Sequence, residues 1–83
     1  MNAEEKIVKA LDRVNKGENL YQLALSLKQE GFSQEELYSL FDFFREKHKN
    51  DQDDTKYDSI LDTMDYISGF CQPKYAIYGE SKL

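Results

Sequence analysis

The sequence predicts an all-α fold, a compact array of four helices followed by a short extended C-terminal tail. Glycine occurs four times and proline once in 83 residues, which leaves few positions for the tight turns of an all-β chain. Apolar residues recur at helical spacing in separate segments, and capping residues or glycines stand near several boundaries. The short links between these segments favour helices packed antiparallel or at a steep angle.

Length and composition are typical of a single folded domain over residues 1–83. The chain is 40% hydrophobic and 13% aromatic, which is too rich in large apolar side chains for a disordered protein. Its one cysteine, Cys71, cannot form an intramolecular disulfide, so a reducing compartment suits the fold. Without a secretory signal pattern or an apolar run of about 20 residues, the chain is expected to be cytoplasmic and not to enter a membrane.

The first helix is expected over residues 3–16. Asn2, followed three residues later by Glu5, fits an N-terminal cap, and Gly17 is expected to close the helix. The apolar stripe of this helix is formed by Ile7, Leu11 and Val14.

The second and third helices are expected over residues 20–30 and 34–48, with Gly31 as the stop between them. Ser33 and Glu36 have the spacing of a capping box, which marks the start of the third helix. Its expected inward face consists of Leu37, Leu40, Phe41 and Phe44.

The fourth helix is expected over residues 55–71, with Gly69 and Pro73 bracketing its end. Its N-terminal cap is left open between three candidates, Asp53, Asp54 and Thr55. The segment 74–78 alternates loosely and is expected to form an extended strap on the bundle.

The most informative pattern is an acidic stripe within the fourth helix. Six aspartates lie between positions 51 and 65, offset only by Lys56, and four of them recur at spacings that stack carboxylates on one helix face: Asp54, Asp58, Asp62 and Asp65. Such repulsion costs a helix a few tenths of a kcal/mol per pair, so the stripe is expected to serve a partner. Tyr57 and Tyr66 lie near its margins as interface anchors. A merely solvated helix face is the alternative interpretation.

A calcium loop matches this region only in part. Asp51, Asp53, Thr55 and Asp62 fall at ligand positions, but Lys56 stands where the loop needs glycine and Asp62 is shorter than the usual glutamate. No metal and no cofactor is therefore expected.

Catalysis has two candidate side chains, His48 and Cys71. No further histidine is present to orient either one, and neither a phosphate-binding glycine loop nor a nucleophile elbow occurs. The simpler role for His48 is that of a cation at the C-terminal end of a helix, and the simpler role for Cys71 is that of a small buried apolar side chain. The chain is expected not to be an enzyme, with a small enzyme using one of these residues as a further alternative.

Nucleic-acid binding is not expected, because the net charge is −5 and the basic residues are scattered. A helix-turn-helix within residues 20–44 would bring Glu35 and Glu36 toward phosphates, which repel them.

One aromatic side chain of the third helix must lie at a boundary, because Phe43 points about 100° away from its neighbours on the helix. Together with three tyrosines it forms a possible apolar patch: Tyr38, Phe43, Tyr75 and Tyr78. This patch is expected either to serve self-association or a partner, or to be covered by the C-terminal strap.

These observations favour a small, non-enzymatic protein-binding module, monomeric or dimeric, whose acidic, tyrosine-bearing face binds a basic protein. One form is an inhibitor or immunity-type protein that offers carboxylates where a toxin or nuclease binds phosphate. The alternative is a homo-oligomerising structural or scaffold subunit that uses the aromatic patch.

Overall fold

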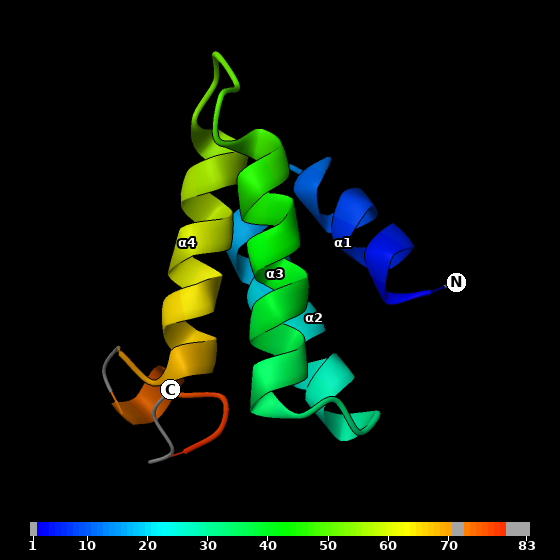
Figure 1. Ribbon diagram of the computed structural model, residues 1–83, viewed down its shortest axis with the longest axis vertical. Helices are drawn as coiled ribbons and strands as arrows, with labels where there is room; N and C mark the ends of the chain where they lie inside the picture. The colour runs from blue at the N-terminus through cyan, green and yellow to red at the C-terminus, as the bar shows by residue number, and fades with distance from the viewer. Residues whose placement is uncertain (1, 71–72, 80–83) are drawn as a thin grey trace.

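The computed structural model describes residues 2–70 and 73–79, and within them the chain forms four α-helices and one 3-10 turn (Figure 1). The elements in order are α1 (Ala3–Leu11), α2 (Lys16–Gln29), α3 (Gln34–His48), α4 (Thr55–Ser68) and η1 (Pro73–Tyr75). No strand occurs in these residues, which confirms the prediction of an all-α fold with four helices.

The most extensive contact between helices joins α3 and α4, which lie side by side and antiparallel and are linked by the connection at residues 49–54 (Figure 1). The start of α3 meets the end of α4, where the Gln34 side-chain amide donates to the Ile67 carbonyl oxygen at 2.9 Å. In Figure 1 α2 lies behind this pair, and α1 lies on the side of α3 away from α4. None of the described helices has the length and apolar character needed to cross a membrane.

One apolar core joins all four helices and the C-terminal segment. Its larger side chains, each almost fully buried, are Ile7, Leu11, Leu20, Leu27, Leu37, Phe41, Phe44, Ile60, Met64, Ile67 and Ile77. The predicted inward face of α3 is present, with Leu40 only partly buried.

The first helix is shorter than the sequence indicates. α1 ends at Leu11 and α2 begins at Lys16, so the prediction of a helix to residue 16 closed by Gly17 is wrong. Val14, which fits the apolar stripe by spacing, is 95% exposed. The chain instead turns at residues 12–15. Leu11 is the last buried residue of α1, and a change of direction is needed before α2 can bring Leu20 into the core.

The start of α3 agrees with its prediction. The Glu36 backbone N–H donates to Ser33 Oγ at 3.1 Å, and the Ser33 backbone N–H donates to Glu36 Oε1 at 3.0 Å, which completes the capping box. The bond from the Ser33 backbone, followed by one from its side chain, lowers the pKa of Glu36.

The fourth helix ends three residues earlier than predicted. α4 stops at Ser68, and Gly69 adopts a left-handed conformation with φ of 88°. Glycine adopts this conformation more easily than other residues, so it commonly terminates helices. Cys71, the predicted last residue, lies outside the described residues.

The described part of the tail lies on the bundle, as the predicted strap does, but as a 3-10 turn and a following turn rather than as extended chain. The Ile77 backbone N–H donates to the Tyr66 carbonyl oxygen at 3.0 Å. The Tyr78 hydroxyl donates to the Phe32 carbonyl oxygen at 2.7 Å. These bonds link the tail to α4 and to the α2–α3 connection.

Candidate functional site: the aspartate face of helix α4

The structure places the four predicted aspartates on the exposed side of α4 and at its N-terminal boundary. We call this set the aspartate face: Asp54, Asp58, Asp62 and Asp65. The opposite side of the same helix carries the buried Ile60, Met64 and Ile67. The alternation between these two sides follows the helical repeat, so packing of the apolar side forces the carboxylates outward.

The N-cap position of α4, left open by the sequence, is occupied by Asp54, and the side-chain bond to the start of the helix comes from Asp53. Asp53 Oδ1 accepts the Thr55 backbone N–H at 3.0 Å, and this bond is the main cause of the lowered pKa of Asp53. Asp54 occupies the boundary position without a side-chain cap bond. Its carboxylate therefore remains part of the aspartate face.

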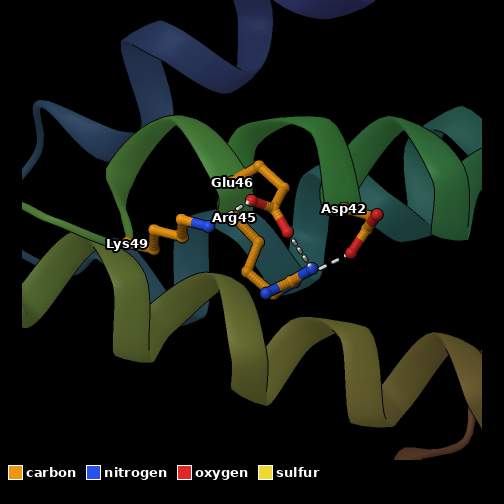
Figure 2. A network of polar contacts seen from close by, with 4 residues as sticks. All are labelled: Asp42, Arg45, Glu46 and Lys49. Atoms are coloured by element: carbon orange, nitrogen blue, oxygen red, sulfur yellow. Dashed lines mark hydrogen bonds and ion pairs between the residues drawn. The ribbon is translucent and has the colours of Figure 1, made fainter.

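Several acidic side chains elsewhere in the described residues have basic partners, whereas others, such as Glu4 and Glu5, have no ion pair there. Arg45 Nε lies 2.7 Å from Asp42 Oδ1 and Arg45 Nη2 lies 2.8 Å from Glu46 Oε1, while Lys49 also pairs with Glu46, forming the network on α3 in Figure 2. The other ion pairs are Lys6–Glu30 and Lys56–Asp12, and His48 Nδ1 also lies 2.8 Å from Asp51 Oδ2. No ion pair among residues 2–70 and 73–79 includes a member of the aspartate face.

The carboxylates of the aspartate face act on one another. The pKa of Asp62 is raised, first by partial burial and then by the negative charges of Asp65 and Asp58. A raised carboxyl pKa means that the charged form is disfavoured in this place. A cation brought close to the face would relieve that repulsion.

The two predicted anchors, Tyr57 and Tyr66, are both partly buried rather than free-standing. Tyr57 lies beside Arg45, whose pKa is raised first by the hydrogen bond to Asp42 and then by one to Tyr57. Tyr66 packs edge-on against Tyr21, with ring centroids 5.3 Å apart. Rings held in this way carry little conformational entropy to lose when a partner binds.

The four residues of the predicted aromatic patch have different neighbours. Phe43 contacts Phe44 edge-on at 5.4 Å, and Tyr75 joins the rings of Tyr21 and Tyr66. Tyr78 lies under the Lys28 ammonium and Tyr38 packs against the core. The structure therefore brings Tyr75 to the margin of α4 and leaves Phe43 on another surface.

Of the two candidate catalytic residues, the structure describes only His48. His48 Nδ1 lies 2.8 Å from Asp51 Oδ2 at the end of α3, where a cation also suits the helix dipole. Cys71 is outside the described residues.

The partial calcium motif forms a hollow at the α3–α4 connection. Asp51 and Asp53 line it together with Lys16 and Lys56, and Lys56 Nζ lies 3.6 Å from Asp12 Oδ1. Lysine ammonium groups therefore supply the positive charge at this place. No group of three or more histidine, cysteine, aspartate or glutamate side chains within the described ranges is arranged to hold a metal ion.

Sequence reasoning missed two features. Tyr21 completes a ring cluster with Tyr66 and Tyr75, and Val8 is 44% exposed on α1. Val8 follows Ile7 directly, and adjacent helix positions point about 100° apart, so its exposure follows from the same geometry that was applied to Phe43.

No protein family model, curated protein sequence or solved structure matches this chain.

Proposed function

We propose that the protein is a non-enzymatic protein-binding module that presents the aspartate face of α4 to a basic protein. The observation that supports this most directly is the gathering of four carboxylates on one exposed helix face. None of them has an ion pair among the described residues, and the charges of Asp65 and Asp58 add to the effect of burial in raising the pKa of Asp62. Lys47 has no ion pair among the described residues, yet it lies near Val8 and Phe43, in a hollow that no residue of α4 lines.

The spacing of the carboxylates suggests how a partner is recognised. Successive turns of an α-helix lie about 5.4 Å apart, so the face offers a row of acceptors at roughly that interval. Lysine and arginine side chains on a partner can each contact one carboxylate, and opposite potentials accelerate the encounter. Forming an ion pair between Asp62 and a cation of the partner costs less desolvation energy, because Asp62 is already partly desolvated. Its acidic neighbours also repel its charge, and the cation would relieve that repulsion.

The concrete form that we favour is an inhibitor or immunity-type protein acting in the cytoplasm. A nuclease or toxin that binds phosphate must expose lysine and arginine side chains, and a rigid row of carboxylates imitates the phosphates that those side chains bind. Tyr57 and Tyr66 then contribute apolar contact at the margins, as tyrosine does at many interfaces.

The test compares two variants that change the net charge equally. The Asp58→Lys, Asp62→Lys variant reverses the centre of the face, and the Glu18→Lys, Glu35→Lys variant makes the same change on α2 and α3. Each full-length protein is immobilised, exposed to lysate of the source organism and eluted with a salt gradient. Proteins retained by wild type are purified, and their dissociation constants are measured by calorimetry at two ionic strengths.

We expect a basic protein whose affinity falls about tenfold or more in the Asp58, Asp62 variant and much less in the control. Its salt dependence should also weaken, while far-ultraviolet circular dichroism shows unchanged helicity. If wild type and both variants retain the same proteins with equal affinity, the aspartate face is only a solvated surface and the proposal fails.

A further inference from the structure

A groove separate from the aspartate face runs between α1 and α3. Two neighbouring hollows of about 580 and 490 Å³ form it. The first is lined by Ala3 and Glu4 of α1 with Glu36 and Leu40 of α3. The second extends further along both helices: besides Glu4 and Glu5 it is lined by Val8 and Lys9 of α1 with Phe43, Phe44 and Lys47 of α3. The two walls therefore run in the same direction. We call this surface the α1–α3 groove.

The middle of the α1–α3 groove exposes apolar surface. Val8 is 44% exposed and Phe43 is 57% exposed, although the adjoining Phe44 belongs to the core. Covering a phenylalanine and a valine side chain is favourable by about 25 cal/mol per Å² of apolar surface removed from water. The groove thus has an apolar centre of the kind that interfaces bury.

The two ends of the groove carry opposite charges. Glu4 and Glu5 lie in the first turn of α1 and Glu36 lies in the first turn of α3, so the end of the groove where both helices begin is acidic. Lys9 and Lys47 line its basic end, where both helices finish. This order follows from the helix dipole, which favours acids in the first turn and bases in the last turn. No ion pair among the described residues uses Glu4, Glu5, Lys9 or Lys47.

We propose that the α1–α3 groove is the contact surface of a homodimer with twofold symmetry. A twofold axis through the groove centre reverses the direction of the groove in the second copy. The basic end of each copy therefore lies on the acidic end of the other copy. The same rotation places Val8 and Phe43 of the two copies against each other. It also sets the helix dipoles of the two copies antiparallel, which is the favourable arrangement.

The charge order identifies a second copy as the occupant. A uniformly basic partner is repelled by Lys9 and Lys47, and a uniformly acidic partner is repelled by Glu4 and Glu5. The fitting partner is one that carries the same two charges in reversed order around an apolar centre, and an antiparallel copy of this chain does so.

This homodimer goes beyond the proposed function and does not depend on it. Neither hollow of the α1–α3 groove has a lining residue from α4. In Figure 1 α1 and α4 lie on opposite sides of α3, so the aspartate faces of two copies stay apart from the contact. Binding of a basic protein and dimerisation can therefore be tested separately.

The first experiment is sedimentation of the full chain over a concentration range from about 1 μM to 1 mM. We expect a reversible monomer–dimer equilibrium for wild type. Phe43→Asp should raise the dimer dissociation constant by about tenfold or more, because an aromatic side chain at the centre of an interface is a typical hot spot. Val14→Asp makes the same kind of change at a site that is 95% exposed and outside both hollows, and it should leave the constant unchanged.

The decisive experiment uses complementary charge variants. Glu4→Lys with Glu5→Lys makes the α1 side of the groove basic throughout, and Lys9→Glu with Lys47→Glu makes the groove acidic throughout. Each variant alone should dimerise at least about tenfold more weakly than wild type, and an equimolar mixture should recover association as a heterodimer. Circular dichroism confirms that each variant remains helical.

Two results overturn the homodimer. One is a wild-type chain that remains monomeric at 1 mM, a result that needs no variant to fold. The other is a wild-type dimer that is insensitive to Phe43→Asp and whose charge variants show no preference for each other over themselves, because the contact then lies elsewhere on the chain.

Discussion

Lys28 and Ile77 are joined by a hydrogen bond of 2.8 Å, donated by the Lys28 ammonium to the Ile77 carbonyl oxygen. The bond connects the end of α2 to the segment that follows η1. The Ile77 side chain is 4% exposed, and its backbone N–H donates to the Tyr66 carbonyl oxygen. The described segment around Ile77 is therefore part of the packed domain rather than a free extension.

Truncation of Ile77 should destabilise the whole domain. Ile77→Ala removes buried methyl and methylene groups and leaves a cavity, which typically costs about 2–5 kcal/mol, and we expect a value near the lower limit at this edge of the core. The free energy of unfolding is measured by urea titration. Val14→Ala is the control and should change it by less than about 0.5 kcal/mol, since Val14 is 95% exposed. Equal effects of the two variants would contradict the placement of Ile77.

Two glycines should respond to alanine with opposite signs. Gly69 has a φ of 88°, which alanine adopts only at a cost, so Gly69→Ala should destabilise the protein by about 1 kcal/mol. Gly17 lies inside α2, and a Cβ there would meet no atom within 4 Å. Gly17→Ala should therefore stabilise the protein by about 0.5–1 kcal/mol. Thermal unfolding of both variants checks the signs, and a loss for Gly17→Ala would support the predicted helix end at that position instead.

The capping box of α3 should account for part of the stability. Ser33→Ala removes the oxygen that accepts the Glu36 backbone N–H, and loss of such a cap costs about 1 kcal/mol. Ser39→Ala is the matched control on the same helix, because Ser39 is exposed and alanine is a better helix former. Urea titration should show a loss for Ser33→Ala and none for Ser39→Ala; similar values would mean that the cap adds little.

The third helix was the most predictable element, because its start signal is local. Ser33 and Glu36 satisfy each other within one turn, so the bounds of α3 depend little on the rest of the chain. The end of α1 depends on tertiary packing instead. Val14 has the correct helical spacing, but only the position of Leu20 in the assembled core determines where the chain must turn.

The local features of the candidate site were also predictable, and its tertiary features were not. Spacing alone places the carboxylates of Asp58, Asp62 and Asp65 on one helix face, and the apolar side of α4 confirms their outward direction. Ion pairing between distant segments is not encoded in local spacing, so the sequence does not reveal that Lys56 pairs with Asp12 rather than with the aspartate face. The α1–α3 groove likewise requires two helices to be placed before Val8 and Phe43 share a surface.

The pH dependence of stability should separate the aspartate face from the paired acids. The pKa of Asp62 is raised above 3.8 in the folded protein, so the folded chain binds this proton more tightly than the unfolded chain does. The free energy of unfolding attributable to Asp62 therefore falls as the pH rises from about 3.8 through the folded pKa, and the penalty persists at neutral pH.

Asp62→Asn removes this penalty and should raise the free energy of unfolding by a few tenths of a kcal/mol at pH 7, with no gain at pH 3, where the carboxyl group is already protonated. Asp42→Asn is the matched control with the opposite sign, because it removes the partner that lies 2.7 Å from Arg45 Nε and should lower stability at pH 7. Urea titrations of both variants at the two pH values provide the measurement. If Asp62→Asn lowers stability at pH 7 as Asp42→Asn does, Asp62 has a stabilising partner, and the unpaired aspartate face on which the proposed function depends does not exist in solution.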